Sequence, residues 1–501
     1  MKRTPNLLFV IADQFRRHSM GFWTEPAFRP HLTTNPDPVY TPHFDAFARQ
    51  SVVLSRAISN YPVCSPFRAM LFSGQFPEQN GVWNNCAPIR TYELRGDIPT
   101  FPSVLHECGY HTGYIGKWHL ECPRPDFDPQ GQYIADDKTY QGPRRFADGS
   151  LPDNEKCWDT LIPQGRQRDI DFLYAYNTWD VFRGNAQMDK LKKPHYWDLA
   201  HHRHIAPDGV WTPEHETDVA ISYLENQQGE RPEEDPFALF VCYNPPHLPY
   251  ESREDTDYDM YDNHYCEQAV PDYHDLIARD NVELDGPDYE RHIRVHFSHI
   301  SGIDRQFGRL LDTLERLHLA DDTIVVFCSD HGEMMGSHGL MSKNVLYEEA
   351  MAIPFLIRCP GMAPKVDDLL LSGVDIMPTI LSLMGLTPHI PAQLQGTDYA
   401  DALRQGGGAR PQSAPFMQIH TKGLQTEHYT FSISDGGAQY TKPALYDNLA
   451  DPYQKNNIPF DEIPPEDLLF LRQQLGFWLK RSNDPWWQER RYADFICYPE
   501  D

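Results

Sequence analysis

The residues best suited to chemistry lie in the run Pro62-Val-Cys64-Ser-Pro66-Phe-Arg68, where a thiol stands at the predicted start of a helix. Residues 65–72 have a helical pattern, and Gly74 is a typical residue for ending it. Free backbone N–H groups and the helix dipole at such a start favour an anion, and they lower the pKa of a thiol. The run predicts a reactive cysteine, against the alternative of an ordinary cysteine near a helix cap.

Two polar clusters directly follow predicted strands. Asp13-Gln14 follows strand 6–12, and Asp330-His331 follows strand 323–328. In an open parallel sheet, sites form at the carboxyl ends of the strands. Two carboxylates, an amide oxygen and an imidazole are a suitable ligand set for a divalent cation. Either pair alone is an ordinary polar strand end, but both pairs together with Cys64 favour a metal site.

Basic side chains make up a third group. Lys117 and His119 lie in Gly116-Lys117-Trp118-His119, His247 lies in Pro246-His247-Leu248-Pro249, and Lys343 follows Met341-Ser342. Taken one by one, each lysine is more simply a solvated surface residue and each histidine a satisfied loop residue. Taken together, they are cationic donors of the kind that stabilises an anionic transition state.

Buried strand-like stretches alternate with helical stretches, which is typical of a parallel sheet covered by helices. The predicted strands are 6–12, 52–58, 111–115, 237–243, 323–328 and 353–358, and the predicted helices are 42–49, 65–72, 101–108, 214–226, 289–317 and 375–384. Residues 121–210 and 244–288 lack this periodicity and predict loops, the first of them a long insertion over one face of the sheet.

A break in composition at 405–412 divides the chain into two predicted units. Three consecutive glycines, Gly406 to Gly408, lie within it. The large unit spans residues 1–405. The smaller unit spans residues 406–501 and contains short strand candidates and one helix at about 465–480.

Composition and charge exclude some partners. The chain has 501 residues, 40% of them hydrophobic, and its 44 basic and 72 acidic side chains give a net charge of −28. This charge repels nucleic acids and anionic membranes, so neither is an expected partner, while a local cationic cleft still suits a small anion. No apolar run approaches the roughly 18 residues of a membrane span.

The cysteines and the N-terminus bear on the expected location. The ten cysteines form no CxxC pair, which argues against a zinc ribbon, a redox dithiol or a disulfide scaffold. Lys2 and Arg3 precede apolar residues 7–12, but a signal peptide needs an apolar core of about 7–15 residues. We interpret this run as the first strand. The expected location is cytoplasmic, or periplasmic or secreted if a signal peptide has been removed.

The motifs occur together in the order typical of one enzyme family. The chain resembles the type I sulfatases of the alkaline phosphatase superfamily over almost its whole length. The motifs that carry the resemblance are Asp13-Gln14, Cys64-Ser-Pro66-Phe-Arg68 with Gly74, Gly113-Tyr-Ile-Gly-Lys117-Trp-His119, Ser329-Asp330-His331-Gly332-Glu-Met-Met-Gly336 and Leu445-Tyr-Asp447-Asn-Leu-Ala-Asp451-Pro452. The resemblance implies an α/β fold with a large mixed sheet flanked by helices. Residues 1–405 would form the sulfatase catalytic domain, and 406–501 a C-terminal α+β subdomain with a small antiparallel sheet and a helix.

The resemblance also implies a role for each motif. A maturation enzyme would oxidise Cys64 to formylglycine, whose hydrated form attacks the sulfur of a sulfate ester and then expels sulfate as the aldehyde re-forms. One divalent cation would be held by residue 64 together with Asp13, Gln14, Asp330 and His331. Arg68 would hold the formylglycine, and Lys117 and Lys343 would bind the sulfate oxygens. His119 would assist release, and His247 would protonate the leaving oxygen or bind the bridging atom.

Two positions depart from the commonest sulfatase pattern. Gln14 stands where many sulfatases have a second Asp, and His331 where many have Asn. The Asp-Gln pair resembles phosphonate monoester hydrolases and choline sulfatases. Because oxygen ligands dominate, Ca²⁺ is the expected cation, and the imidazole makes Mn²⁺ the second choice. Glu333 and His338 follow the metal motif and could support its ligands.

Three hypotheses follow for the function. The leading one is a formylglycine-dependent sulfatase that hydrolyses a sulfate ester, of a sulfated carbohydrate, to an alcohol and inorganic sulfate. The alternative is a phosphonate monoester or phosphodiester hydrolase on the same metal–formylglycine site, since sulfate and phosphate monoanions share tetrahedral geometry. A non-catalytic relative that binds a sulfated ligand is disfavoured, because every expected catalytic residue type is present. The expected partners are a small-molecule or saccharide sulfate ester and the maturation enzyme.

The oxidation of Cys64 can be tested by peptide mass spectrometry on protein made in a host that has the maturation enzyme. The tryptic peptide Ala57–Arg68 contains Cys64 as its single cysteine. We expect the mass of an aldehyde in place of the thiol, together with reactivity toward a hydrazide. An unmodified, alkylatable Cys64 in that host would count heavily against the formylglycine mechanism.

Overall fold

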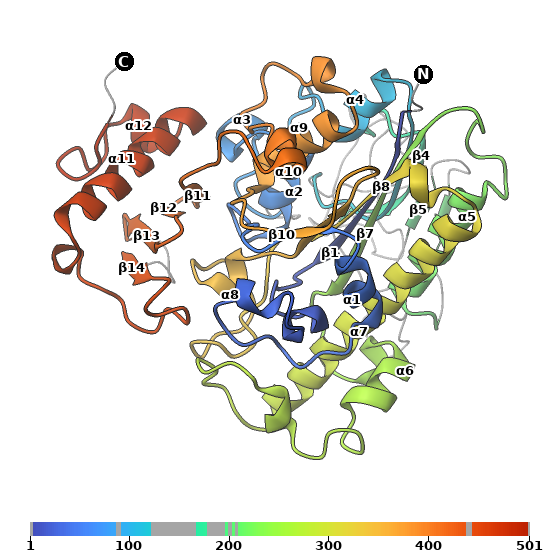
Figure 1. The fold of residues 1–501 in the computed structure, drawn as a ribbon, viewed down its shortest axis with the longest axis horizontal. Coiled ribbons are helices and arrows are strands. Elements are labelled where there is room, and N and C mark those ends of the chain that lie inside the picture. The colour runs from blue at the N-terminus through green and yellow to red at the C-terminus, as the bar shows by residue number, and fades with distance from the viewer. Residues whose placement is uncertain are drawn as a thin grey trace, which may run out of the picture.

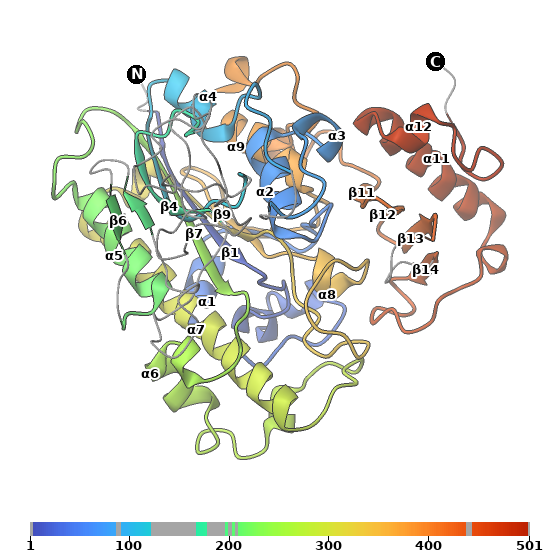
Figure 2. The same cartoon turned by 180° about the vertical axis from the view of Figure 1, so that it is seen from behind.

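The computed structural model describes residues 4–86, 92–121, 167–177, 196–198, 203–205, 209–436 and 443–498. Figure 1, and Figure 2 from behind, show a large α/β body and a smaller C-terminal part beside it. Within the described ranges, ten strands form one sheet in the body and four form a separate sheet in the C-terminal part. The predicted fold class, a large mixed sheet flanked by helices with a smaller α+β part, is confirmed.

The large sheet is built around parallel strands. In spatial order, they are β8 (Thr323–Ser329), β1 (Asn6–Asp13), β7 (Phe237–Pro246), β3 (His111–Lys117) and β4 (Phe172–Tyr176). One flank adds β9 (Phe355–Arg358), β2 (Val52–Leu54) and β10 (Lys365–Asp367), and the other adds β5 (Tyr196–Asp198) and β6 (Arg203–Ile205). β9 runs antiparallel to β8, and β5 antiparallel to β4, so the sheet is mixed. The carboxyl ends of the central strands meet at one edge.

Both faces of the sheet are buried under helices. Along β1, Leu7, Phe9 and Ile11 belong to one core and Leu8, Val10 and Ala12 to the other, which is the alternation expected of a strand covered on both sides. The first core is completed by α2 (Cys64–Ser73), α4 (Phe101–Glu107) and α9 (Gly373–Leu383). The second is completed by α1 (Pro42–Ala48), α5 (Thr212–Glu225) and α7 (Pro287–Arg316).

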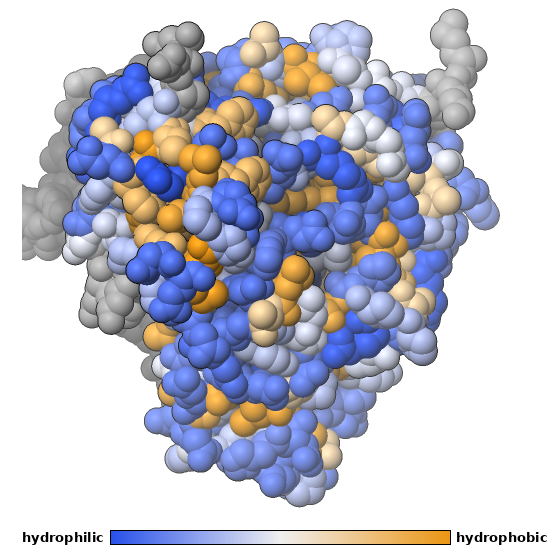
Figure 3. All heavy atoms as spheres, turned by 60° about the vertical axis from the view of Figure 1, so that its left-hand side comes forward, coloured by the Kyte–Doolittle hydropathy of each residue, from blue (hydrophilic) through white to orange (hydrophobic). Residues whose placement is uncertain are grey.

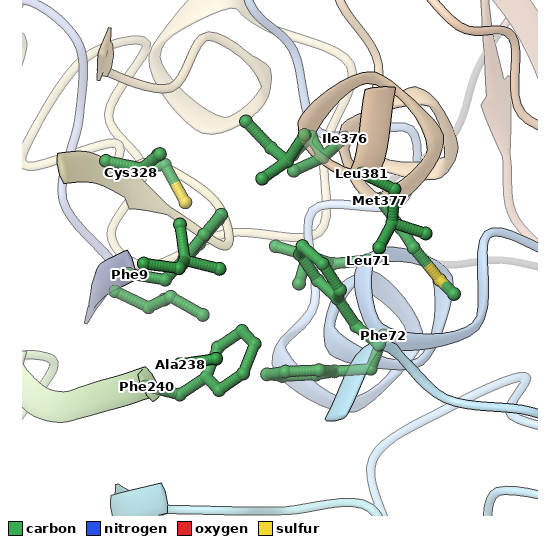
Figure 4. Close-up of a cluster of buried hydrophobic side chains, with 14 of the residues drawn as sticks. Phe9, Leu71, Phe72, Ala238, Phe240, Cys328, Ile376, Met377 and Leu381 are labelled. Carbon is green, nitrogen blue, oxygen red and sulfur yellow. The ribbon is translucent and has the colours of Figure 1, made fainter. Parts of the chain in front are cut away.

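The first core fixes the helix that begins at Cys64. Figure 4 shows Phe9 and Phe240 of the sheet facing Leu71 and Phe72 of α2 and Met377 of α9. Burying a side chain of this size contributes roughly 1.5–3 kcal/mol. All ten residues of α2 are buried, and the helix ends at Gly74 with a φ of 61°. The position of Cys64 is therefore set by core packing along the whole helix.

The C-terminal part packs a sheet against a helix. Its antiparallel strands are β11 (Ala414–Met417), β12 (Thr421–Gln425), β13 (Tyr429–Ser434) and β14 (Ala444–Asp447), and its helices are α11 (Pro465–Ser482) and α12 (Pro485–Gln488). Leu471, Leu475 and Leu479 of α11 share a core with Leu424 and Phe431 of the sheet. The face of the molecule drawn in Figure 3 is mostly hydrophilic, with smaller hydrophobic areas among the polar ones.

Most predicted elements are present, with differences at their ends. β2 stops at Leu54 instead of extending to residue 58, because its partners β9 and β10 are short and Ile58 makes only isolated bridges, to Ala352 and Ser372. β9 begins at Phe355, after Pro354, which has no N–H to donate. The described stretches of 167–210 contribute β4 to β6, and the rest of the predicted insertion 121–210 lies outside the described residues. The division of the chain at 405/406 stays a prediction.

Short helices complete the described chain, and none of its helices could cross a membrane. The short helices are α3 (Pro77–Asn80), α6 (Tyr258–Met260), α8 (Glu348–Met351) and α10 (Ala400–Gln405). In the part of the chain that the structure describes, every helix is too short or too polar to cross a bilayer.

Gly116 allows β3 to approach β7 directly before Lys117. Its φ is 94°, and a Cβ added there would lie 2.3 Å from the carbonyl oxygen of Cys242. Gly116→Ala should cost about 3 kcal/mol, since left-handed strain costs roughly 1–2 kcal/mol and overpacking roughly 1–3 kcal/mol. Gly109→Ala is the matched control, because its φ is 83° and nothing lies within 4 Å of the added Cβ. Thermal unfolding should show the larger decrease in Tm for Gly116→Ala, and equal decreases would contradict the steric argument.

Candidate active site

Several elements converge at the carboxyl edge of the central strands. β1 ends at Asp13, β3 ends at Lys117, and Asp330 and His331 directly follow β8. α2 begins at Cys64 on the same side of the sheet, 3.5 Å from a carboxylate oxygen of Asp13. Parallel strands whose carboxyl ends share an edge bring these residues together although they lie far apart in the chain.

Cys64 lies at the centre of this group. Its side chain is 1% exposed, and its Sγ lies 3.3 Å from Nε2 of His331 and 3.5 Å from Oδ1 of Asp13. Burial and the Asp13 carboxylate oppose ionisation, but the charges of Lys117, Lys343 and His331 outweigh them and hold the pKa of the thiol well below its ordinary value. The environment of residue 64 therefore favours a negative charge.

Two carboxylates and an imidazole surround Cys64. Nε2 of His331 lies 3.6 Å from Oδ1 of Asp13 and 3.7 Å from Oδ1 of Asp330. Burial, and then the neighbouring Asp13 carboxylate, raise the pKa of Asp330 to about 7. Desolvation also opposes ionisation of Asp13, but nearby positive charges, that of Lys117 first, hold the pKa of Asp13 well below its usual range.

The same group has the donor chemistry of a cation site. One ligand atom each from Asp13, Cys64, Asp330 and His331 lie within 4.8 Å of one another, and all four residues are buried. Nδ1 of His331 lies 2.9 Å from the carbonyl oxygen of Gly332, so a proton there leaves the Nε2 lone pair facing the carboxylates. Oxygen and imidazole donors that converge around buried carboxylates fit one divalent cation.

Two permanent cations contact the carboxylates. The Arg68 guanidinium reaches Asp330 (3.2 Å) and Asp13 (3.3 Å), and it donates to the carbonyl oxygen of Lys117 at 2.9 Å. Nζ of Lys117 lies 2.8 Å from Oδ2 of Asp13 and 2.8 Å from Oδ1 of Asn244. Asn244 was not predicted from the sequence. The available signal was its place near the carboxyl end of the strong strand β7.

Gln14 and Lys343 meet at one side of the group. Gln14 is fully buried with a φ of 67°, a conformation that is uncommon outside glycine, and its N–H donates to Asp330 at 3.1 Å. Its side-chain oxygen accepts a hydrogen bond from the Lys343 ammonium, and its side-chain nitrogen contacts Glu333 and Tyr250. Strained backbone in a buried polar cluster is a frequent mark of a functional site.

The two predicted histidines lie beside this group. Nε2 of His119 lies 3.1 Å from the carbonyl oxygen of Cys86, and burial lowers the pKa of its ring. His247 is partly exposed, with Nδ1 3.0 Å from the carbonyl oxygen of Leu248. Desolvation, followed by the charges of Lys343 and Lys117, lowers the pKa of His247 to about 4. Both rings are therefore neutral at pH 7 in the free protein.

Comparison with known proteins identifies similar sequences and folds. A sequence model of the sulfatase family matches residues 5–386, and one described as N-sulphoglucosamine sulphohydrolase, C-terminal, matches residues 336–474. An endo-4-O-sulfatase of Bacteroides thetaiotaomicron is 37% identical over an alignment of 519 positions, gaps included. The alignment covers 99% of this chain and 95% of that protein.

Solved structures share the fold. One, from work on the metabolism of multiple glycosaminoglycans by Bacteroides thetaiotaomicron, has a TM-score of 0.87 at 36% identity, over 99% of this chain and 100% of that one. A phosphonate monoester hydrolase of Agrobacterium radiobacter has a TM-score of 0.59 at 21% identity, over 95% of this chain and 94% of that one. At this level of identity, the similarity to the phosphonate monoester hydrolase is a similarity of fold alone.

Removing Arg68 should show how strongly the buried carboxylates depend on it. Arg68→Met leaves Asp13 and Asp330 with one fewer countercharge, and breaking a buried ion pair typically costs about 3–5 kcal/mol. We expect a large decrease in Tm in the presence of EDTA. Arg49→Met is the control, because Arg49 pairs with Glu25 at the surface and its side chain is 56% exposed. A decrease in Tm as small as that of the control would show that the carboxylates do not need Arg68.

Proposed function

We propose that the substrate is a sulfated saccharide, because the chain belongs to the sulfatase family and is therefore a sulfuric-ester hydrolase. The family match spans residues 5–386, which include every residue of the buried group. The saccharide is supported by the 36% identical structure, whose description concerns the metabolism of glycosaminoglycans, and by a 24% identical relative named N-acetylglucosamine-6-O-sulfatase. The products would be the desulfated saccharide and inorganic sulfate.

The observation that carries the proposal is the buried group around Cys64. Cys64 is the proposed precursor of formylglycine, whose oxygen would take the place that Sγ occupies. At that place the residue would face His331 and Asp13, both within 3.5 Å of Sγ. Arg68 would hold the arrangement by tying Asp13 and Asp330 to the end of β3.

One divalent cation would be bound by Asp13, Gln14, Asp330, His331 and residue 64. The chemistry that such a cation supplies is a potent oxygen nucleophile at neutral pH. Carboxylate and amide oxygens favour Ca²⁺, and the His331 imidazole makes Mn²⁺ the second choice. The convergent donors within 4.8 Å of one another support this assignment.

The basic residues would bind the sulfate group and move protons. Lys117 and Lys343 would contact sulfate oxygens. His119 with its proton on Nε2, toward Cys86, has Nδ1 unpartnered among the described residues, so Nδ1 can accept a proton from the hydrated residue 64. His247 would protonate the leaving oxygen. A bound sulfate ester adds negative charge near Lys117 and Lys343, which would raise the pKa of His247 from its value of about 4.

A second candidate function is phosphonate monoester or phosphodiester hydrolysis on the same site. Its support is the uncharged amide of Gln14 in the proposed cation site, because the Asp-Gln pair resembles phosphonate monoester hydrolases as well as choline sulfatases. Both substrate classes present a tetrahedral monoanion to the same two lysines. The two functions would therefore differ in the relative rates at which the two substrate classes are hydrolysed, and not in the residues used.

Relative rates on two esters with one leaving group test the assignment. We expect the matured enzyme to have a higher kcat/KM for 4-nitrophenyl sulfate than for 4-nitrophenyl phenylphosphonate, and to release sulfate from a sulfated disaccharide. Cys64→Ala should lower kcat/KM by on the order of 10³-fold or more, because the nucleophile is lost. Cys359→Ala, which removes another buried thiol, is the control and should retain activity. A preference for the phosphonate would favour the second function.

A further inference from the structure

The side-chain amide of Gln14 is held in one orientation by its neighbours. Its Nε2 donates to the Glu333 carboxylate and lies 3.3 Å from the Tyr250 hydroxyl oxygen. The Tyr250 hydroxyl donates its own proton to the carbonyl oxygen of Pro246 at 2.8 Å, so it is an acceptor for Gln14. On the other side, Oε1 of Gln14 accepts from the Lys343 ammonium, which is only a donor.

Exchanging the nitrogen and oxygen of this amide would make both sides repulsive. The oxygen would then face the Glu333 carboxylate, which is an acceptor, and the NH₂ group would face the Lys343 ammonium, which is a donor. Because Gln14 is fully buried, water cannot relieve either contact. The charges on both sides therefore fix the amide with Oε1 toward Lys343 and Nε2 toward Glu333.

Glu333 is itself firmly held by the loop that follows β8. It is fully buried, and its Oε1 accepts the main-chain N–H groups of Met335 (3.0 Å) and Ser342 (2.5 Å). These bonds leave Oε2 for Gln14. The hydrogen-bond donors that the described residues bring to Glu333 are N–H groups, so both of its carboxylate oxygens act as acceptors.

We propose that Glu333 is a positioning residue for the cation site. It would fix Gln14 with the amide oxygen toward the cation, and it would supply nearby the negative charge that a glutamine at position 14 lacks. This also accounts for the residue type at position 14, since a carboxylate there would meet that of Glu333. The inference rests on the proposed cation site, but it can fail independently of it.

Calcium affinity of the full-length protein, measured by isothermal titration with CaCl₂, tests this role without using turnover. Glu333→Gln should weaken Ca²⁺ binding about 10- to 100-fold, as is typical when the support of a metal ligand is lost. One amide oxygen at residue 333 cannot accept from Gln14, Met335 and Ser342 together, so Gln14 loses its fixed orientation. The double variant Q14E/E333Q should recover most of the affinity, because the carboxylate introduced at position 14 would then be oriented by the NH₂ group introduced at position 333.

Two further variants separate positioning from folding and from charge. Glu349→Gln changes another buried carboxylate, which contacts Arg279 and Asn281 and not Gln14, so the fold should weaken while Ca²⁺ affinity stays within about 3-fold of wild type. Glu333→Asp keeps the charge but withdraws the carboxylate from Gln14. It should weaken Ca²⁺ binding too, and it replaces Glu333→Gln in the test if that variant does not fold.

The outcomes distinguish this role from the site on which it rests. If wild type binds Ca²⁺ and both Glu333 variants bind it equally well, Glu333 does not position Gln14 and the inference is wrong. Equal losses in Glu333→Gln and Glu349→Gln, or a double variant no better than Glu333→Gln, would also overturn it. If wild type binds neither Ca²⁺ nor Mn²⁺, the proposed cation site fails first, and the role of Glu333 falls with it.

Discussion

The candidate active site is organised by two carboxyl groups that the fold buries. Asp13 and Asp330 are both inaccessible to solvent, and each lies within 4 Å of the same nitrogen of His331. An isolated buried carboxylate is costly, so such groups persist only where cations and hydrogen bonds compensate them. Arg68 contacts both carboxyl groups and Lys117 contacts one, so two permanent positive charges lie against the buried pair. A bound divalent cation would then give the site the positive charge that attracts an anionic ester.

The scaffold can hold these charges because rigid elements deliver each of them. β1, β3 and β8 bring Asp13, Lys117 and Asp330 to one edge of the sheet, and α2 brings Cys64 and Arg68. The core in Figure 4 packs α2 against the sheet and α9, so residue 64 cannot shift without disturbing that packing. Positions held within a fraction of an ångström are what reactions at an anionic centre require.

Around the carboxylates, a layer of neutral and charged groups fixes the orientation of the ligands. The carbonyl oxygen of Gly332 orients His331, and Asn244 orients Lys117. Glu333 and Tyr250 orient Gln14 on the side opposite Lys343. Such contacts carry no chemistry of their own. They determine which lone pair or proton each ligand presents, and so they decide what the site can bind.

The sequence by itself determined the elements and the motifs at their ends. Continuous apolar runs identified β1, β7 and β8, helix-start residues identified α2, and the strand-end runs at residues 13 and 330 predicted a cation site. These are local patterns, written within a few residues. Tertiary structure alone decided that β9 runs antiparallel, that Asn244 bonds to Lys117, and that Glu333 faces Gln14. The last contact joins residues 319 positions apart, and such a pairing depends on strand order, register and packing, which no local pattern specifies.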